Sequence, residues 1–263
     1  MKRITFLVLT FLLIATFIYA AAGNDPRIWF SHPAQKWDSG GLPIGNGRMG
    51  AMMMGGIQKD VIQFNEQSLW SGDNNWDGGY ETGDHGFGSY RNFGVVEVDF
   101  NQKDSANNYK RSLNLVKGIY KVSFNSHGIT YRREAFASHP DQVMVFSYTT
   151  AGKTDQLSGH ISLQSAQGAA VQGDDNSLQF AGIMPNKLKY AAKLVVQHKG
   201  GMVVVKDNEL YFTKCNSITL YLDARTNYKP DYHAGWRGVD PLPVVEKELN
   251  AATDKKYKKL LLA

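Results

Sequence analysis

The sequence predicts an all-β protein, a large antiparallel β-sandwich (a supersandwich) with a C-terminal linker helix. Between Pro26 and Leu222, short runs rich in β-branched and aromatic residues follow one another, and several alternate between apolar and polar residues. Gly, Asn, Asp and Ser separate these runs at spacings typical of antiparallel sandwiches. The absence of a repeat of fixed period argues against a propeller or a solenoid.

The first residues have the pattern of a cleavable signal peptide. Lys2 and Arg3 precede the apolar run Ile4–Ile18, and the small residues Ala20–Ala22 form a cleavage site. A membrane anchor is the alternative, but a spanning helix needs roughly 20 apolar residues. We therefore expect residues 1–22 to be removed, the protein to be secreted or periplasmic, and no membrane association after cleavage.

Composition narrows the function classes. Residues 23–242 are long enough for one large β domain with a sizeable core. The only cysteine, Cys215, excludes an intramolecular disulfide and is expected to be a small buried residue. The net charge of +5 is weak for this size, and no nucleic-acid motif accompanies it. The histidines show no metal-ligand spacing and no nucleotide-binding loop occurs, so we expect neither a metal nor a cofactor.

A glycine-rich stretch near the N-terminus organises the chain. Leu42–Gly56 (LPIGNGRMGAMMMGG) predicts a compact turn that leads into buried strands. Asp60–Gly72 (DVIQFNEQSLWSG) then alternates like a strand, breaks at Asn65 and Glu66, and closes on Trp70. A short strand that delivers an amide, a carboxylate and an indole to a loop is typical of places where sugars are held.

The remaining strands are expected in the following order: 95–100, 118–125, 129–138, 143–149, 160–164, 177–181, 190–198, 202–206, 209–213 and 217–222. Lys206–Glu209 is expected to form a hairpin turn, because Asp207 and Asn208 tolerate left-handed φ.

Two segments depart from this β pattern. Ser71–Asn92 is rich in glycine and aromatic residues and has no clear period, which is typical of a functional loop or of one that lines an edge. Pro243–Ala263 has apolar residues at helical spacing. Its apolar face implies either that the helix folds back onto the sheets or that more protein follows. Its lysine cluster is expected to be a solvated helix face rather than a contact to an acidic surface.

Six motifs in order carry a family resemblance: WFSHPAQKW (29–37), LPIGNGRMGAMMMGG (42–56), FNEQSLWSG (64–72), YRREAFASHPDQVMVFSY (131–148), KLKYAAKLVV (187–196) and ITLYLDARTNY (218–228). Together they resemble the amino-terminal domain of glycoside hydrolase family 95, the inverting α-L-fucosidases and their α-L-galactosidase relatives. The resemblance covers nearly the whole chain after residue 22.

The resemblance implies that substrate contact and catalysis are divided between two domains. Residues 243–263 correspond to the start of a helical linker to an (α/α) barrel, which in the family carries the catalytic acid and base; no position here matches them. We therefore expect no catalytic residue in this chain and an activity on fucosylated glycans that requires the barrel, normally in the same chain. Asn65, Glu66, Trp70 and Trp76 are the predicted residues of a domain interface or of outer sugar subsites.

The residues alone leave alternatives at each candidate position. Glycoside hydrolysis requires two opposed carboxyl groups, and spacing selects no pair among Glu66, Asp73, Asp77, Glu81 and Asp84. For Asn65 and Glu66, turn capping or pairing with Arg48 is favoured over catalysis. For Asn46 and Arg48, a turn locked by their side chains is favoured over contact with a ligand. Trp37 and Trp70 are expected either in the core or stacked on the face of a sugar, and Trp76 is expected to have a surface role.

Three functions remain open at this point. The chain is a domain of a hydrolase, a free-standing carbohydrate-binding module, or a structural domain without a ligand of its own.

Overall fold

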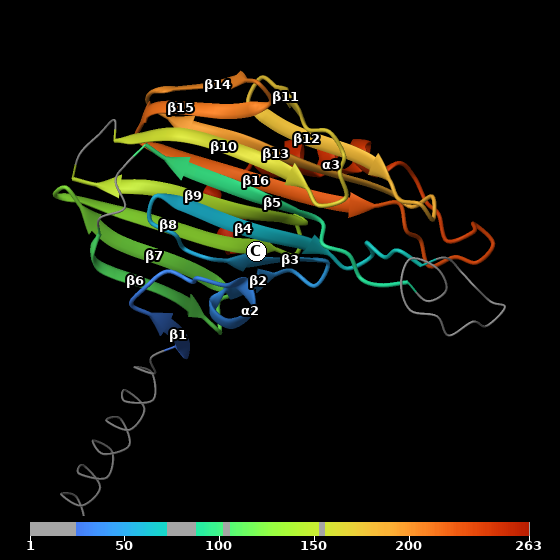
Figure 1. Ribbon diagram of the computed structural model, residues 1–263, viewed down its shortest axis with the longest axis horizontal. Helices are drawn as coiled ribbons and strands as arrows, with labels where there is room; N and C mark the ends of the chain where they lie inside the picture. Colours follow the sequence, from blue (N-terminus) through green and yellow to red (C-terminus); the bar gives the residue numbers. More distant parts are fainter. Residues whose placement is uncertain (1–24, 73–87, 102–105, 153–155, 263) are drawn as a thin grey trace, which may run out of the picture.

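The computed structural model describes residues 25–72, 88–101, 106–152 and 156–262 (Figure 1). In this part of the chain, two antiparallel sheets of nine and seven strands pack face to face. The predicted all-β sandwich is therefore confirmed. Side chains from both sheets form one large hydrophobic core between them.

The nine-stranded sheet has, in spatial order, the strands β1 (Arg27–Phe30), β6 (Asn107–Asn114), β7 (Ile119–Ser126), β8 (Ile129–Ser138), β9 (Val143–Ala151), β16 (Ser217–Thr226), β13 (Lys189–Lys199), β12 (Ser177–Ile183) and β11 (Gln172–Asp174). The seven-stranded sheet has β14 (Met202–Lys206), β15 (Glu209–Cys215), β10 (Leu157–Ser165), β5 (Gly94–Phe100), β4 (Lys59–Glu66), β3 (Met49–Met53) and β2 (Leu42–Gly45).

Strand β4 runs further than the sequence predicts. The expected alternation is present, with Ile62 and Phe64 buried in the core. The expected break at Asn65 and Glu66 is wrong, because both residues pair with β3 and the strand ends only after Glu66. Alternation therefore carries the Glu66 side chain inward, on the same face as Phe64.

Two local expectations about turns and burial are confirmed. Asp207 and Asn208 have φ values of 54° and 59°, as a tight hairpin turn between β14 and β15 requires. Cys215 is fully buried at the end of β15.

The C-terminal segment forms two helices instead of the single expected one, α3 (Pro241–Thr253) and α4 (Tyr257–Leu261). Helix α3 begins two residues early because the Asp240 carboxylate accepts a hydrogen bond from the Leu242 N–H and caps it. Val245 and Leu249 pack with strand residues on the outer face of the nine-stranded sheet. This segment therefore folds back onto the sandwich, one of the two expected possibilities, on the far side of the sheets in Figure 1.

Candidate functional site

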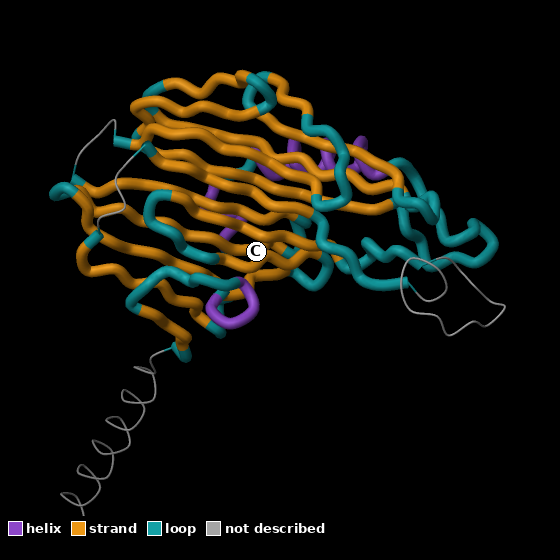
Figure 2. Tube along the Cα trace, in the orientation of Figure 1, coloured by secondary structure: helices purple, strands orange, loops and turns teal. Residues whose placement is uncertain are grey.

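Loops from distant parts of the sequence gather at one end of the sandwich, on the right in Figure 2. They follow β4, connect β12 to β13, and follow β16, and they border an open pocket of about 600 Å³. Its lining residues are Gln67, Ser68, Trp70, Gly72, Asn186, Leu188, Tyr228, Gly235, Trp236 and Arg237.

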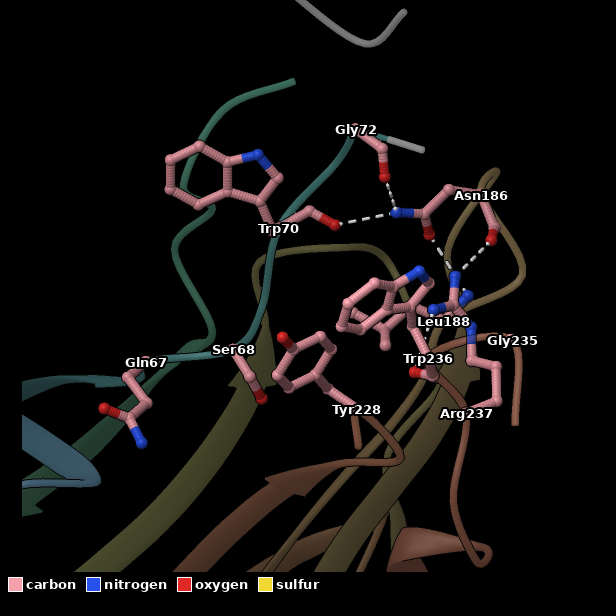
Figure 3. Close-up of a pocket in the computed structure, with 10 residues that line it drawn as sticks. All are labelled: Gln67, Ser68, Trp70, Gly72, Asn186, Leu188, Tyr228, Gly235, Trp236 and Arg237. Atoms are coloured by element: carbon pink, nitrogen blue, oxygen red, sulfur yellow. Dashed lines mark hydrogen bonds between the residues drawn. The ribbon is translucent and has the colours of Figure 1, made fainter. Parts of the chain in front are cut away.

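Three aromatic side chains dominate this pocket (Figure 3). Trp70 and Tyr228 are 45% and 47% exposed, although large aromatic residues are usually far more buried. The Tyr228 and Trp236 rings are parallel within 2°, with centroids 6.5 Å apart. Trp236 has a φ of 61°, a conformation that is an outlier for a bulky residue. The loop therefore holds this indole at the pocket against a local backbone cost.

A polar frame fixes the loops that carry these rings. The Asn186 Nδ2 donates hydrogen bonds to the backbone oxygens of Trp70, at 2.9 Å, and of Gly72. The Arg237 Nη2 donates to the Asn186 backbone oxygen at 2.8 Å. Asn186 therefore links the loops after β4 and after β16, as Figure 3 shows.

The pocket keeps hydrogen-bonding capacity beyond this frame. Arg237 carries five N–H donors, and besides its bond to Asn186 its guanidinium donates from Nη1 to the Trp236 backbone oxygen at 3.1 Å. The Trp236 Nε1 is buried without a hydrogen-bond partner in the described part of the chain. None of the described lining residues is a carboxylate. The described pocket can therefore stack on an apolar face and donate to neutral oxygens, but supplies no acid and base for hydrolysis.

Glu66 lies beneath the pocket and not in its lining. Only 3% of the residue is exposed, and its Oε2 accepts hydrogen bonds from the Ser68 N–H at 3.0 Å and the Ser68 Oγ at 2.6 Å. Burial raises the pKa of Glu66, and these hydrogen bonds oppose the rise. The Asn65 Oδ1 accepts only from the Glu66 N–H among the described contacts. The Glu66 carboxylate thus caps the turn that presents Ser68, as the capping interpretation expects, whereas the Asn65 side chain bonds only within the strand.

The Asn46 and Arg48 side chains close a turn. The Asn46 Oδ1 accepts from the Arg48 and Met49 N–H groups, and its Nδ2 donates to the Ser138 backbone oxygen at 3.1 Å. Arg48 bonds to Gln142 and to the Asp223 carboxylate at 2.7 Å. These contacts join the β2–β3 turn to the other sheet, so the structural interpretation of the GNGR motif is the one that the geometry supports.

The other predicted positions are placed as follows. Trp37 is 54% exposed in the short helix α2 (Trp37–Gly40), so it belongs neither to the core nor to the pocket. Trp76 and the acidic residues at 73, 77, 81 and 84 lie outside the described residues. Sequence reasoning missed four residues of the site, Asn186, Tyr228, Trp236 and Arg237, although Tyr228 ends one of the family motifs. The other available signal was the pair Trp236-Arg237 between Gly235 and Gly238.

Other site types find no support in the described part of the chain. No cluster of three or more histidine, cysteine, aspartate or glutamate residues there has the arrangement of a metal site. No helix among the same residues has the length and apolar character needed to cross a bilayer.

Fold and site together define an antiparallel β-sandwich domain whose loops present an aromatic pocket at one end. The model of the family described as "Glycosyl hydrolase family 65, N-terminal domain" matches residues 28–86 and 79–231, and the chain belongs to this family. The matching model is that of family 65, whereas the sequence motifs resemble family 95. What the comparisons support is the coarser assignment, an N-terminal β-sandwich domain of a glycoside hydrolase.

The curated relatives carry α-fucosidase names. The chain is 27% identical to "Alpha-L-fucosidase 2" of Arabidopsis thaliana over 168 residues, which is 53% of this chain and 20% of that protein. It is 22% identical to "Probable alpha-fucosidase A" of Aspergillus oryzae over 289 aligned positions, which is 89% of this chain and 38% of that protein. The chain thus spans well under half the length of these relatives.

A solved structure shares the fold. The "Putative kojibiose phosphorylase from human microbiome" superposes with a TM-score of 0.52 at 12% identity, over 90% of this chain and 37% of that one. At this identity the likeness shows the fold alone.

Proposed function

We propose that the chain is the N-terminal domain of an exported, inverting α-L-fucosidase of the family 95 type, which acts on fucosylated glycans together with a helical catalytic barrel. The observation that carries the proposal is the open pocket of Trp70, Tyr228 and Trp236 in a chain whose relatives are named α-fucosidases. Aromatic faces and spare N–H donors suit a neutral sugar, which has both C–H faces and hydroxyl groups.

In this proposal the pocket supplies an outer sugar subsite, and hydrolysis belongs to the barrel. The lack of carboxylates among the described lining residues supports this division. The same observation favours a second candidate, a carbohydrate-binding domain that works without catalysis. Export rests on the sequence pattern of residues 1–22, which lie outside the described residues.

Calorimetric titration with a fucosylated oligosaccharide tests the proposed subsite. We expect saturable binding that weakens roughly tenfold or more in Trp236→Ala, because truncating a central aromatic contact removes most of its binding energy. Trp37→Ala is the matched control, since it removes an exposed indole outside the pocket. Equal affinity of both variants and the parent, or no binding, would contradict the subsite.

A nitrophenyl α-L-fucoside assay tests the division of labour. We expect no turnover by this chain alone and turnover when a relative's helical barrel is fused after Ala263. Steady turnover by the chain alone would show that the catalytic groups lie within it. A titration that shows binding, combined with an inactive fusion, would favour the binding-domain candidate.

A further inference from the structure

A second groove lies far from the aromatic pocket, on the outer face of the nine-stranded sheet. It has a volume of about 930 Å³ and crosses β7, β8, β9, β16 and β13, which are consecutive neighbours in the sheet (Figure 1). The segment between α3 and α4 and the start of α4, from Lys255 to Lys258, line it as well.

Strand register arranges the groove floor in two rows that run across the strands. The first row is Ser123, Arg132, Thr149, Ser217 and Lys199, and the second is Lys121, Glu134, Ser147, Thr219 and Gln197. Each row places hydroxyl groups between long charged or amide side chains. Since neighbouring strands lie about 4.8 Å apart, Arg132 and Lys199 are separated by three spacings, roughly 14 Å. In the second row, Glu134 is engaged by Lys121 and Tyr257, and Gln197 by Tyr221 and Thr253. The first row therefore presents polar groups at regular spacing along a line, as a linear chain of repeating units requires.

The groove has an unbalanced positive charge. Its only carboxylate, Glu134, is bound by the Lys121 Nζ at 2.8 Å and by the Tyr257 hydroxyl at 2.7 Å. Lys255 pairs with Asp141. Arg133, which also borders the groove, pairs with Asp60 between the sheets. The other lysine and arginine residues of the groove have no acidic partner among the described residues: Arg132, Lys199, Lys256 and Lys258. Four unpaired cations along one groove raise the local potential and attract a polyanion.

The floor of the groove is lined by hydroxyl-bearing side chains that solvent can reach. Helix α3 covers the neighbouring part of this sheet face with Val245 and Leu249. In the groove beside this helix, the side chains of Ser147, Thr149 and Thr219 are partly exposed to solvent. These hydroxyls match the hydroxyl groups of a sugar chain, and the surrounding cations match its charges.

We infer that this groove binds an acidic polysaccharide, a chain of sugars that carries carboxylate or sulfate groups. The cations pair with the anionic groups, and the floor hydroxyls bond to the sugar hydroxyls. This site is distinct from the aromatic pocket, and the inference does not depend on the proposed function. Its charge selects a different class of ligand from the neutral sugar proposed for the pocket.

Affinity electrophoresis of the chain tests the inference, with polygalacturonate as the carboxylate probe, dextran sulfate as the sulfate probe and neutral dextran as the blank. We expect retardation by at least one charged probe and none by dextran. The triple variant Lys199→Gln, Lys256→Gln and Lys258→Gln should weaken binding roughly tenfold, because three exposed ion pairs to the probe are lost and each contributes modestly. Added salt should weaken the parent's binding as well.

A matched control removes the same number of charges elsewhere. Lys36, Lys206 and Lys214 are exposed and lie outside the groove, so their triple change to Gln should alter affinity less than twofold. Equal losses in the two triple variants would show attraction by net charge alone and overturn the site. The absence of retardation by both charged probes would overturn it too.

A second variant separates a saccharide from an acidic protein as the occupant. Thr219→Val keeps the β-branched shape on the strand and removes a floor hydroxyl. We expect it to weaken binding of the charged polysaccharide and to leave binding of polyglutamate unchanged. Polyglutamate that binds as tightly as the polysaccharides, with no effect of Thr219→Val on any probe, would assign the groove to an acidic protein and contradict our inference.

Discussion

Two arginines lie near aromatic rings in different settings. Arg133 is enclosed between the two sheets, where it stabilises the fold, whereas Arg237 borders the open pocket, where it can contact a ligand. The Arg133 side chain is 5% exposed; it donates to the Gly56 and Ile57 backbone oxygens and pairs with Asp60 at 3.3 Å. Its guanidinium also lies 4.8 Å from the Phe100 ring centroid. Arg237 makes two backbone contacts and borders an open pocket.

The two arginine sites differ in how completely protein groups satisfy their hydrogen-bonding capacity. Asp60 is fully buried, and it accepts hydrogen bonds from the Gly55 N–H and the Tyr148 hydroxyl, both at 3.1 Å, besides its contact with Arg133. Burial nevertheless raises the pKa of Asp60, because removal from water penalises the charged carboxylate more than its partners stabilise it. Arg237 has five N–H donors and makes two side-chain hydrogen bonds, at the edge of a pocket that is open to solvent. A guanidinium enclosed by backbone oxygens and a carboxylate stabilises the fold, whereas one at the edge of an open pocket can also reach a ligand.

The largest expected effect comes from opening the enclosed cluster. Arg133→Met should lower the free energy of unfolding by about 3–5 kcal/mol, because it leaves Asp60 as an uncompensated buried charge. Urea denaturation measures this loss. The adjacent Arg132→Met is the control; its side chain is exposed, so a change within about 0.5 kcal/mol is expected. A loss below about 1 kcal/mol in Arg133→Met would contradict the assigned structural role.

Asp223 is expected to have an effect on stability of intermediate size. It is fully buried on β16 and pairs with Arg48 of the β2–β3 turn. Burial raises its pKa to about 7, against the opposing pull of Arg48. The folded state then holds more protons than the unfolded state between about pH 4 and 7, so the free energy of unfolding should fall as pH rises through this window.

Thermal or urea unfolding at several pH values checks this slope, with Asp223→Asn as the comparison. The variant carries no titrating group at this position, so its stability should depend less steeply on pH between 5 and 7 than that of the parent. Parallel profiles for the two proteins would show that Asp223 is ionised throughout this range in the folded state.

Loosening the frame of the pocket should have a smaller effect. Asn186→Ala removes the side-chain hydrogen bonds to Trp70 and Gly72, with an expected cost of about 1–2 kcal/mol at net values near 1 kcal/mol per bond. The exposed Asn250→Ala, in helix α3, should leave stability unchanged or slightly higher through helix propensity. If both variants unfold at the same urea concentration as the parent, the frame does not constrain the loops.

The sequence predicted the β-strands correctly where apolar residues alternate with polar ones along the strand. The strands at 129–138 and 202–206 have the predicted bounds, and both alternate clearly. Strand β6 (Asn107–Asn114) was not predicted, because one of its inward-facing positions is Arg111, which is fully buried and donates to the His32 backbone oxygen at 2.8 Å. A buried polar side chain that bonds to distant carbonyls has no signature in local periodicity.

The pocket was harder to predict than the fold for the same reason. Trp70 was found because it follows a strand and stands in a motif. Asn186 and Trp236 are more than 100 positions away from it along the chain, and the sandwich topology alone brings them together. The inward position of Glu66 depended on how far β4 continues, and pairing with β3 decides that. Sequence reasoning thus reached the loop but not its partners.

The smallest expected effect is on stability at the pocket itself. Trp70 contacts the Tyr90 ring at a centroid distance of 6.3 Å, and it is 45% exposed. Trp70→Ala should therefore lower the free energy of unfolding by only about 0.5–1 kcal/mol, the contribution of a partly exposed aromatic pair. Phe93→Ala, at a fully buried ring, should cost about 3–5 kcal/mol in the same urea titration. A comparable loss at Trp70 would mean that the pocket rings are held for folding, and the contrast with the enclosed cluster would fail.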